Sequence, residues 1–249
     1  MNEKDLQQIV FMDIETVARQ PELGELPEEW QEMFRQKTTW QKPELTTWED
    51  FYKERAAILS EFGQIVCISV GYFNQPGDIR ELRVKSYFGK NEKLLLQQFF
   101  EEVGKLVDRI KNGYQFCGHN LKEFDIPYLC RRSLINEIPL PEWMNIFRTS
   151  RSWEHPVIDT LQAWRFGDYK NYTSLNLLAA CLGIPSPKTD LDGSKVGHTY
   201  WVENDLPRIA AYCQKDVITC ARILQRMHGL NMLTDEEIVE VGSSEITGA

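Results

Sequence analysis

The sequence has little of what sulfur- and nitrogen-based metal sites or disulfide frameworks require. Its six cysteines form no Cys-x-x-Cys pair, and each lies in an apolar stretch. Its four histidines are scattered along the chain. A zinc site therefore lacks ligands at suitable spacing. Reduced cysteines that fill core positions are the simplest interpretation.

Long apolar runs are also missing. No stretch approaches the roughly 20 apolar residues that a membrane-spanning helix needs. The first residues, MNEKDLQQIVFMDIE, combine acidic side chains with a short apolar run, which is not the pattern of a signal peptide. We therefore expect a cytoplasmic protein that does not contact a membrane.

The basic excess common in nucleic-acid-binding proteins is absent, because the formal net charge is −9. The acidic excess lies at the two ends. Residues 1–62 carry 14 acidic and 7 basic side chains, and residues 232–249 carry 5 acidic and no basic ones. The middle therefore holds a basic excess of three. This charge leaves a polyanionic substrate open, and it makes positioning by a protein partner a compatible interpretation.

The remaining pattern is that of an α/β protein. Apolar and β-branched runs predict strands at 8–14, 65–73, 81–88 and 114–118, and helical spacing predicts helices at 91–111, 126–135, 173–182 and 204–228. This order predicts an antiparallel meander followed by a helical crossover. We expect one domain over residues 1–231, with a helical insertion at about 17–62. The acidic residues 232–249 are expected to form a weakly ordered tail.

Acidic residues occupy suggestive positions in three segments. Asp13 and Glu15 are two apart at the end of the first strand, so both side chains leave the same face. Asp125 follows the fourth strand, and Asp216 lies four residues after Tyr212 on the long helix. Each feature alone has an ordinary explanation, such as a helix cap for Asp125 or a surface pair for the last two.

The combination is more specific than its members. Four converging carboxylates repel one another and raise one another's pKa unless cations neutralise them. Oxygen-only ligands favour Mg²⁺ or Mn²⁺ over zinc. Two such ions can activate water and stabilise the leaving oxygen of a phosphodiester.

At this point the sequence resembles a known family. The strings FMDIET (11–16), HNLKEFD (119–125) and YCQKD (212–216) are similar to the three exonuclease motifs of the DEDD superfamily, in the form of its tyrosine branch. The nearest likeness is to stand-alone bacterial relatives of the proofreading domain of family-B DNA polymerases. The resemblance covers roughly residues 8–228 and implies a ribonuclease-H-like fold with a mixed central sheet flanked by helices.

The resemblance also implies roles for individual residues. Asp13 would bridge two divalent cations, Glu15 and Asp216 would complete the site on the nucleophile side, and Asp125 would hold the second ion. Tyr212 would orient the attacking water. The terminal nucleotide would be placed by Thr16, Asn120 and Phe124. The loop residue Lys188 would contact phosphate or simply be solvated.

The implied activity is metal-dependent 3′→5′ hydrolysis of single-stranded nucleic acid to nucleoside 5′-monophosphates. DNA is favoured as substrate and RNA remains open. A catalytically silent binding module on the same fold and a nucleotide phosphohydrolase are the alternatives. The aromatic residues of the insertion are expected to pack it onto the sheet rather than to stack bases, and Asp159 is expected to cap a helix.

Overall fold

The computed structural model describes residues 1–74, 80–110, 113–185 and 191–246. Lys188 lies outside the described residues. Seven strands form one mixed sheet in the order β5-β4-β1-β2-β3-β6, and β7 also pairs with β3. The strands are β1 (Ile9–Ala18), β2 (Gly63–Asn74), β3 (Glu81–Phe88), β4 (Gln115–Gly118), β5 (Val157–Asp159), β6 (Ile238–Glu240) and β7 (Ser244–Glu245).

Strand directions follow the expected meander and crossover. β1, β2 and β3 are antiparallel neighbours, whereas β4 pairs parallel to β1 and β5 parallel to β4. The ribonuclease-H-like α/β fold predicted from the sequence is confirmed. Parallel neighbours require a crossover connection, and α3 (Glu92–Ile110) provides it between β3 and β4.

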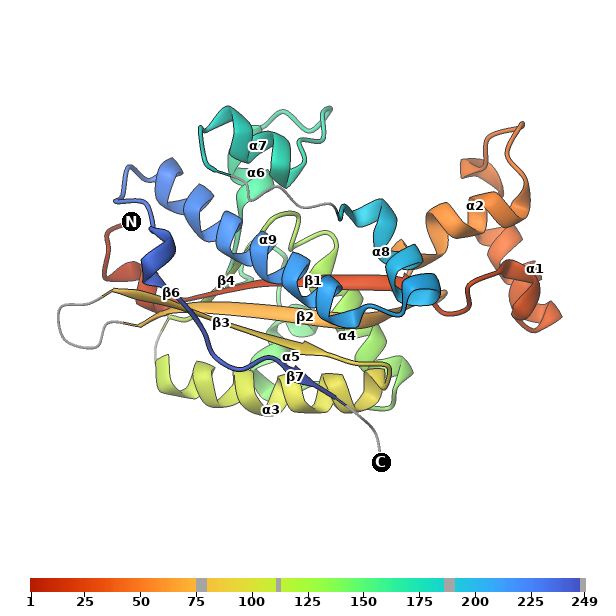
Figure 1. Cartoon of the computed structure of the whole chain (residues 1–249), viewed down its shortest axis with the longest axis horizontal. Helices are drawn as coiled ribbons and strands as arrows, with labels where there is room; N and C mark the ends of the chain where they lie inside the picture. Colours follow the sequence, from red (N-terminus) through yellow and green to blue (C-terminus); the bar gives the residue numbers. More distant parts are fainter. Residues whose placement is uncertain (75–79, 111–112, 186–190, 247–249) are drawn as a thin grey trace.

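Helices cover both faces of the sheet (Figure 1). One face packs against α3, α4 (Asp125–Ile135) and α5 (Glu142–Thr149), and the other packs against α9 (Leu206–Met227). Shorter helices connect these layers: α6 (Thr160–Arg165), α7 (Leu175–Cys181) and α8 (Val196–His198). Among the described residues, no helix is both long and apolar enough to cross a membrane.

α9 approaches the sheet closely where β2 lacks a side chain. A Cβ at Gly71 would lie 2.8 Å from a methyl group of Val217. The glycine therefore admits the helix against β2, next to β1, the strand that carries Asp13 and Glu15. The face of α9 that meets the sheet is apolar, and its residues are all buried: Ile209, Cys213, Val217, Cys220 and Leu224.

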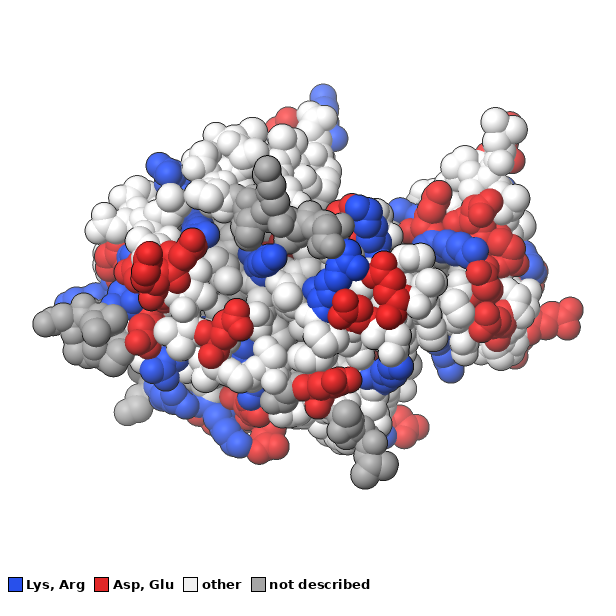
Figure 2. Space-filling view, viewed as in Figure 1, with Lys and Arg blue, Asp and Glu red and all other residues white. Residues whose placement is uncertain are grey.

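The insertion forms a lobe at one end of the sheet (Figure 1). It holds α1 (Glu28–Thr38) and α2 (Trp48–Arg55), and its core gathers around Phe34, whose ring contacts Trp48, Phe51, Tyr52 and Phe62. The aromatic residues of the insertion were expected to pack it onto the sheet. Trp48, Phe51 and Tyr52 pack instead in a core of the lobe itself, which includes Ala18 at the end of β1. Trp40 is 80% exposed and does not pack there. Acidic side chains gather on the visible face of this lobe (Figure 2).

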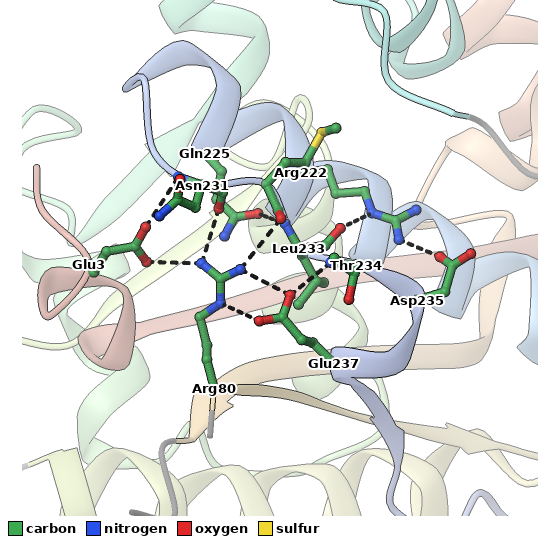
Figure 3. A network of polar contacts seen from close by, with 10 residues as sticks. Glu3, Arg80, Arg222, Gln225, Asn231, Leu233, Thr234, Asp235 and Glu237 are labelled. Carbon is green, nitrogen blue, oxygen red and sulfur yellow. Dashed lines mark hydrogen bonds and ion pairs between the residues drawn. The ribbon is translucent and has the colours of Figure 1, made fainter. Parts of the chain in front are cut away.

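The expectation of a weakly ordered acidic tail is wrong for the residues that the structure describes. β6 and β7 both pair parallel with β3, and Leu233 is buried at 3% exposure. Arg80 donates to both carboxylate oxygens of Glu237, at 3.1 and 3.0 Å, and Arg222 pairs with Asp235 (Figure 3). Two acidic residues of this segment thus meet arginines, one of them 157 positions away in the sequence, which a count of charges along the chain does not reveal.

Candidate active site

Two of the predicted acids lie side by side on the central strand. Asp13 and Glu15 belong to β1, and the intervening Ile14 packs on the opposite face in the core formed with α3 and α4. Strand alternation therefore directs both carboxylates toward the α9 layer. The pairing of β1 with β2 shifts between Glu15 and Thr16. Such a bulge bends the strand and re-aims side chains, here at the edge of the site.

Asp125 reaches the same place from the first turn of α4. Its Oδ1 accepts a hydrogen bond of 3.2 Å from the backbone N–H of Ile14, and its side chain is only 4% exposed. This contact joins residues 111 positions apart in the sequence. It holds the third carboxylate against the strand segment that carries the first two.

α9 supplies the fourth acid and the tyrosine. Asp216 and Tyr212 both line the cleft that contains Asp13, Glu15 and Asp125. The Tyr212 hydroxyl donates a hydrogen bond to the Asp216 carboxylate. The structure therefore brings all five predicted catalytic residues into one cleft.

The electrostatics of this cluster are those of buried carboxylates that repel one another. Burial first, and then Glu15, Asp216 and Asp125, raise the pKa of Asp13 well above its usual range. Burial and Asp216 do the same to the pKa of Glu15. Since burial and like charge both disfavour the ionised form, the cluster is unfavourable without positive charge.

The other two acids are shifted in the same direction. Burial raises the pKa of Asp125 to about 7, although its backbone hydrogen bonds act in the opposite direction. Burial raises the pKa of Asp216 to about 6, although the hydrogen bond from Tyr212 opposes it. The hydroxyl of Tyr212 also has a raised pKa, through burial and the nearby Asp216, so it stays protonated.

The cleft has a volume of about 620 Å³. Thr16, Asn120 and Phe124, the predicted contacts to the terminal nucleotide, all line it. Asn120 adopts a left-handed backbone conformation with φ of 71°, which asparagine tolerates better than most residues. The last turn of the insertion contributes Ala57 and Ile58 to the rim.

A family model described as a predicted 3′-5′ exonuclease related to the exonuclease domain of PolB matches residues 58–241. This is most of the chain. The chain belongs to this family. The matched residues include Asp125, Tyr212 and Asp216, whereas Asp13 and Glu15 lie before them and join the site only in three dimensions.

A solved structure supports the fold of this exonuclease family member. The family B DNA polymerase from the hyperthermophilic archaeon Pyrobaculum calidifontis matches with a TM-score of 0.53 and 14% identity over 87% of this chain. The chain spans 24% of the length of that polymerase. At this identity the likeness concerns the fold alone. No curated protein matches the chain.

The donor set of the cleft fits hard divalent cations. Its carboxylate oxygens come from three different elements. The raised pKa values of all four acids indicate that positive charge would stabilise their ionised forms. Carboxylates with those properties suit Mg²⁺ or Mn²⁺.

Cys213 is a member of the site that the sequence analysis placed only in the core. Its Sγ lies 3.3 Å from Oδ2 of Asp13, and one ligand atom each from Asp13, Glu15 and Cys213 lie within 4.8 Å of one another. Burial raises the pKa of this thiol, so it donates a hydrogen bond to Asp13 rather than offering a thiolate. Sequence reasoning could have assigned Cys213 to the site from its position directly after Tyr212.

Asp159 accepts hydrogen bonds from a second segment besides the helix that it was expected to cap. It caps α6 as predicted, accepting from the N–H groups of Leu161 and Gln162. The same carboxylate accepts from the N–H groups of Asn120 and Lys122, at 3.1 and 3.0 Å. It therefore fixes the loop between β4 and α4 that leads into Asp125.

Proposed function

We propose that the chain is a metal-dependent exonuclease that removes nucleotides from the 3′ end of single-stranded nucleic acid and releases nucleoside 5′-monophosphates. DNA is the favoured substrate and RNA is accepted as an alternative. The observation that carries the proposal is the convergence of two buried acids, two half-buried acids and one tyrosine, from β1, α4 and α9, in a single open cleft. Membership of the exonuclease family supports the direction of degradation.

Two divalent cations, Mg²⁺ or Mn²⁺, are proposed to occupy the acid cluster. Asp13 would contact both, Glu15 and Asp216 would complete the position on the side of the nucleophile, and Asp125 would hold the second. When bound, the ions supply Lewis acidity toward the water and charge stabilisation at the phosphoryl group. The raised pKa values in the cluster support this assignment, because cations remove the repulsion among the four carboxylates.

Tyr212 is proposed to position the attacking water through its hydroxyl group. In hydrolysis the water oxygen forms a new bond to phosphorus, and the bond between phosphorus and the 3′ oxygen of the penultimate nucleotide breaks. The terminal nucleotide leaves as a 5′-monophosphate, and the departing 3′ oxygen takes up a proton. Because Tyr212 donates its one hydroxyl proton to Asp216, its phenol oxygen would accept a hydrogen bond from the water.

Thr16, Asn120 and Phe124 are proposed to hold the terminal nucleotide, since all three line the cleft beside the acids. Phe124 offers a ring face for the base. Asn120 offers an amide and is held in place by its backbone hydrogen bond to Asp159. Lys188 remains a proposed phosphate contact on the basis of the sequence alone.

The test is degradation of 5′-labelled single-stranded DNA and RNA with Mg²⁺ or Mn²⁺, resolved as product ladders. We expect stepwise shortening from the 3′ end, loss of activity with a chelator, and recovery when either ion is restored. Mononucleoside triphosphates in a parallel reaction separate an exonuclease from a nucleotide phosphohydrolase. Oligonucleotides that stay intact with Mn²⁺ while the protein is folded would overturn the proposal.

A further inference from the structure

The segment between α6 and α7 exposes aromatic rings at regular spacing. Phe166, Tyr169 and Tyr172 are three residues apart and are 92%, 74% and 64% exposed. Single exposed apolar residues are common on protein surfaces and need no explanation. Three exposed aromatic side chains within seven residues are less common, and we call these three residues the aromatic platform.

The backbone displays the first ring rather than hiding it. Phe166 ends α6 in a left-handed conformation with φ of 44°, and Gly167 follows with φ of 91°. A bulky residue is strained in this conformation. Packing does not account for that strain, since the ring remains almost wholly in solvent. The ring is therefore available to a ligand.

The platform is continuous with the proposed active site. Tyr172 lines the same cleft as the four acids, and its ring meets that of His119 at 6.4 Å. His119 Nε2 contacts the carbonyl oxygen of Thr173 at 2.8 Å. These contacts fix the inner end of the platform to the loop that precedes Asp125.

The outer end is attached to the same loop. Arg165 pairs with Glu123 at 3.3 Å, and its guanidinium lies 5.8 Å from the centre of the Tyr169 ring. The segment is therefore held at two points along the rim of the cleft, so its rings lie at defined positions beside the path into the site.

The net charge around the platform is more favourable for a phosphate backbone than the net charge of the whole protein. Basic residues slightly outnumber acidic ones here, with Lys122, Arg165 and Lys170 against Glu123 and Asp168. The surface over α6 and α7 is largely uncharged in Figure 2, in contrast to the acidic lobe of the insertion. Aromatic faces interleaved with isolated basic side chains are the combination that binds single strands without reading their sequence.

We propose that Phe166, Tyr169 and Tyr172 stack the bases of a single strand whose 3′ end occupies the cleft. This inference rests on the proposed exonuclease function and adds a binding subsite outside the acid cluster. Stacking requires unpaired bases, so the platform favours single strands over duplexes. Because every base has a π face and stacking does not use the 2′-hydroxyl, the platform contributes similarly to DNA and RNA of any sequence.

Binding and hydrolysis of two substrates test the platform. The double variant Phe166→Ala/Tyr169→Ala removes the two rings that do not line the cleft. We expect it to bind a long 5′-fluorescein-labelled oligothymidylate about tenfold or more weakly in fluorescence anisotropy. Hydrolysis of a dinucleotide, which has too few bases to fill both the cleft and the platform, should fall much less. Both side chains are exposed, so the thermal midpoint should stay unchanged.

Two further variants define what is lost. Phe166→Trp/Tyr169→Trp should retain binding, whereas Phe166→Leu/Tyr169→Leu should not, because leucine keeps apolar area without a ring face. Trp153→Ala is the matched control. Trp153 is 70% exposed with Arg151 over its ring, and it lies outside the set of residues that line the cleft.

Anisotropy is measured in a chelator, where no hydrolysis takes place, so failure of the platform is separable from failure of the exonuclease function. Unchanged long-strand affinity in the alanine double variant would overturn the proposal, and would be the result if the rings bind a protein partner instead. An equal loss of affinity with Trp153→Ala would also overturn it, because the effect would then not belong to this surface.

Discussion

The molecule buries acidic side chains in two very different ways. Glu92, at the start of α3, accepts hydrogen bonds from Nε of Arg132 at 2.9 Å and from the backbone N–H of Ile65 at 2.7 Å. Asn136 donates to the same carboxylate. In the cleft, Asp13 receives a hydrogen bond from a thiol, and the charges that shift its pKa are those of other carboxylates.

This difference indicates that Glu92 stabilises the fold, whereas the cleft acids are proposed to bind cations. Glu92 is neutralised by an arginine of the same chain, so burial leaves its charge compensated. The pKa values of the cleft acids are raised by burial and, for Asp13, Glu15 and Asp125, by neighbouring carboxylates, and the proposed cations would compensate this charge. A buried like-charge cluster destabilises the protein, and this cost is what a divalent cation removes on binding.

The largest expected effect comes from Asp13→Asn. This change keeps the shape of the side chain and removes the charge proposed to contact both cations. Turnover of single-stranded DNA should fall by about a thousandfold or more. Stability should stay the same or rise, because repulsion in the cluster decreases. Glu101→Gln, on the exposed side of α3, is the control and should match the parent in both measurements. Retained turnover in Asp13→Asn would show that the acid cluster is not the catalytic centre.

Arg132→Met should show the opposite behaviour. It leaves the carboxylate of Glu92 buried without its arginine, which typically costs about 3–5 kcal/mol. For a chain of this size the thermal midpoint should fall by roughly 10 °C. The adjacent Arg131 is exposed, so Arg131→Met is a matched control with little expected change. A thermal midpoint of Arg132→Met equal to that of its control would show that Glu92 needs no partner. The proposed difference between Glu92 and the cleft acids would then be wrong.

Tyr212→Phe separates positioning from metal binding within the cleft. The ring and its packing persist, and only the hydroxyl is lost. We expect turnover to fall by about ten- to a thousandfold. The affinity for Mn²⁺, measured by calorimetry, should persist, whereas Asp216→Asn should weaken it. Should Tyr212→Phe turn over like the parent, the tyrosine would be a packing residue and its proposed role wrong.

Much of this architecture could be predicted from the sequence because it depends on local patterns. Period-two apolar runs gave β3 its observed ends at 81–88, and apolar residues at helical spacing placed α3 and α9 within two residues. The candidate acids were identified by their spacing within three short motifs. Such patterns arise within one element and need no knowledge of its neighbours.

The remaining features depend on contacts between distant residues. β5 has only three residues, too few for a recognisable alternation, and β6 is held by pairing with β3 and by the arginine network. The second task of Asp159 joins α6 to a loop some 40 positions earlier, at Asn120. The thiol of Cys213 looked like core because the helix periodicity that buries it also brings it to Asp13.

The smallest expected effect tests the electrostatics of the cleft directly. In the metal-free protein the pKa of Asp216 is raised to about 6 and that of Asp125 to about 7. A pKa raised above the unfolded value of about 4 contributes stability that is fully present below pH 4. That contribution is lost as the pH rises through 6 and 7, because the folded state must then hold ionised, repelling carboxylates.

The variant Asp216→Asn cannot ionise, so its free energy of unfolding should exceed that of the parent by an amount that grows between pH 5 and pH 7. The gain should reach up to about 3 kcal/mol, the equivalent of roughly two pKa units. Taking the difference between the two proteins removes the titration of His119, whose pKa is lowered by burial and which affects both alike. Urea unfolding in a chelator at several pH values measures it, with Asp108→Asn as an exposed control.

Mg²⁺ or Mn²⁺ should reverse the ranking. Cations stabilise the folded parent, and they do so more strongly at pH 8 than at pH 5, because protons compete for the same oxygens. Asp216→Asn should gain less from either ion. A constant stability difference across this pH range would mean that Asp216 is already compensated within the chain, as Glu92 is. The distinction between the two kinds of buried acid would then fail at that residue.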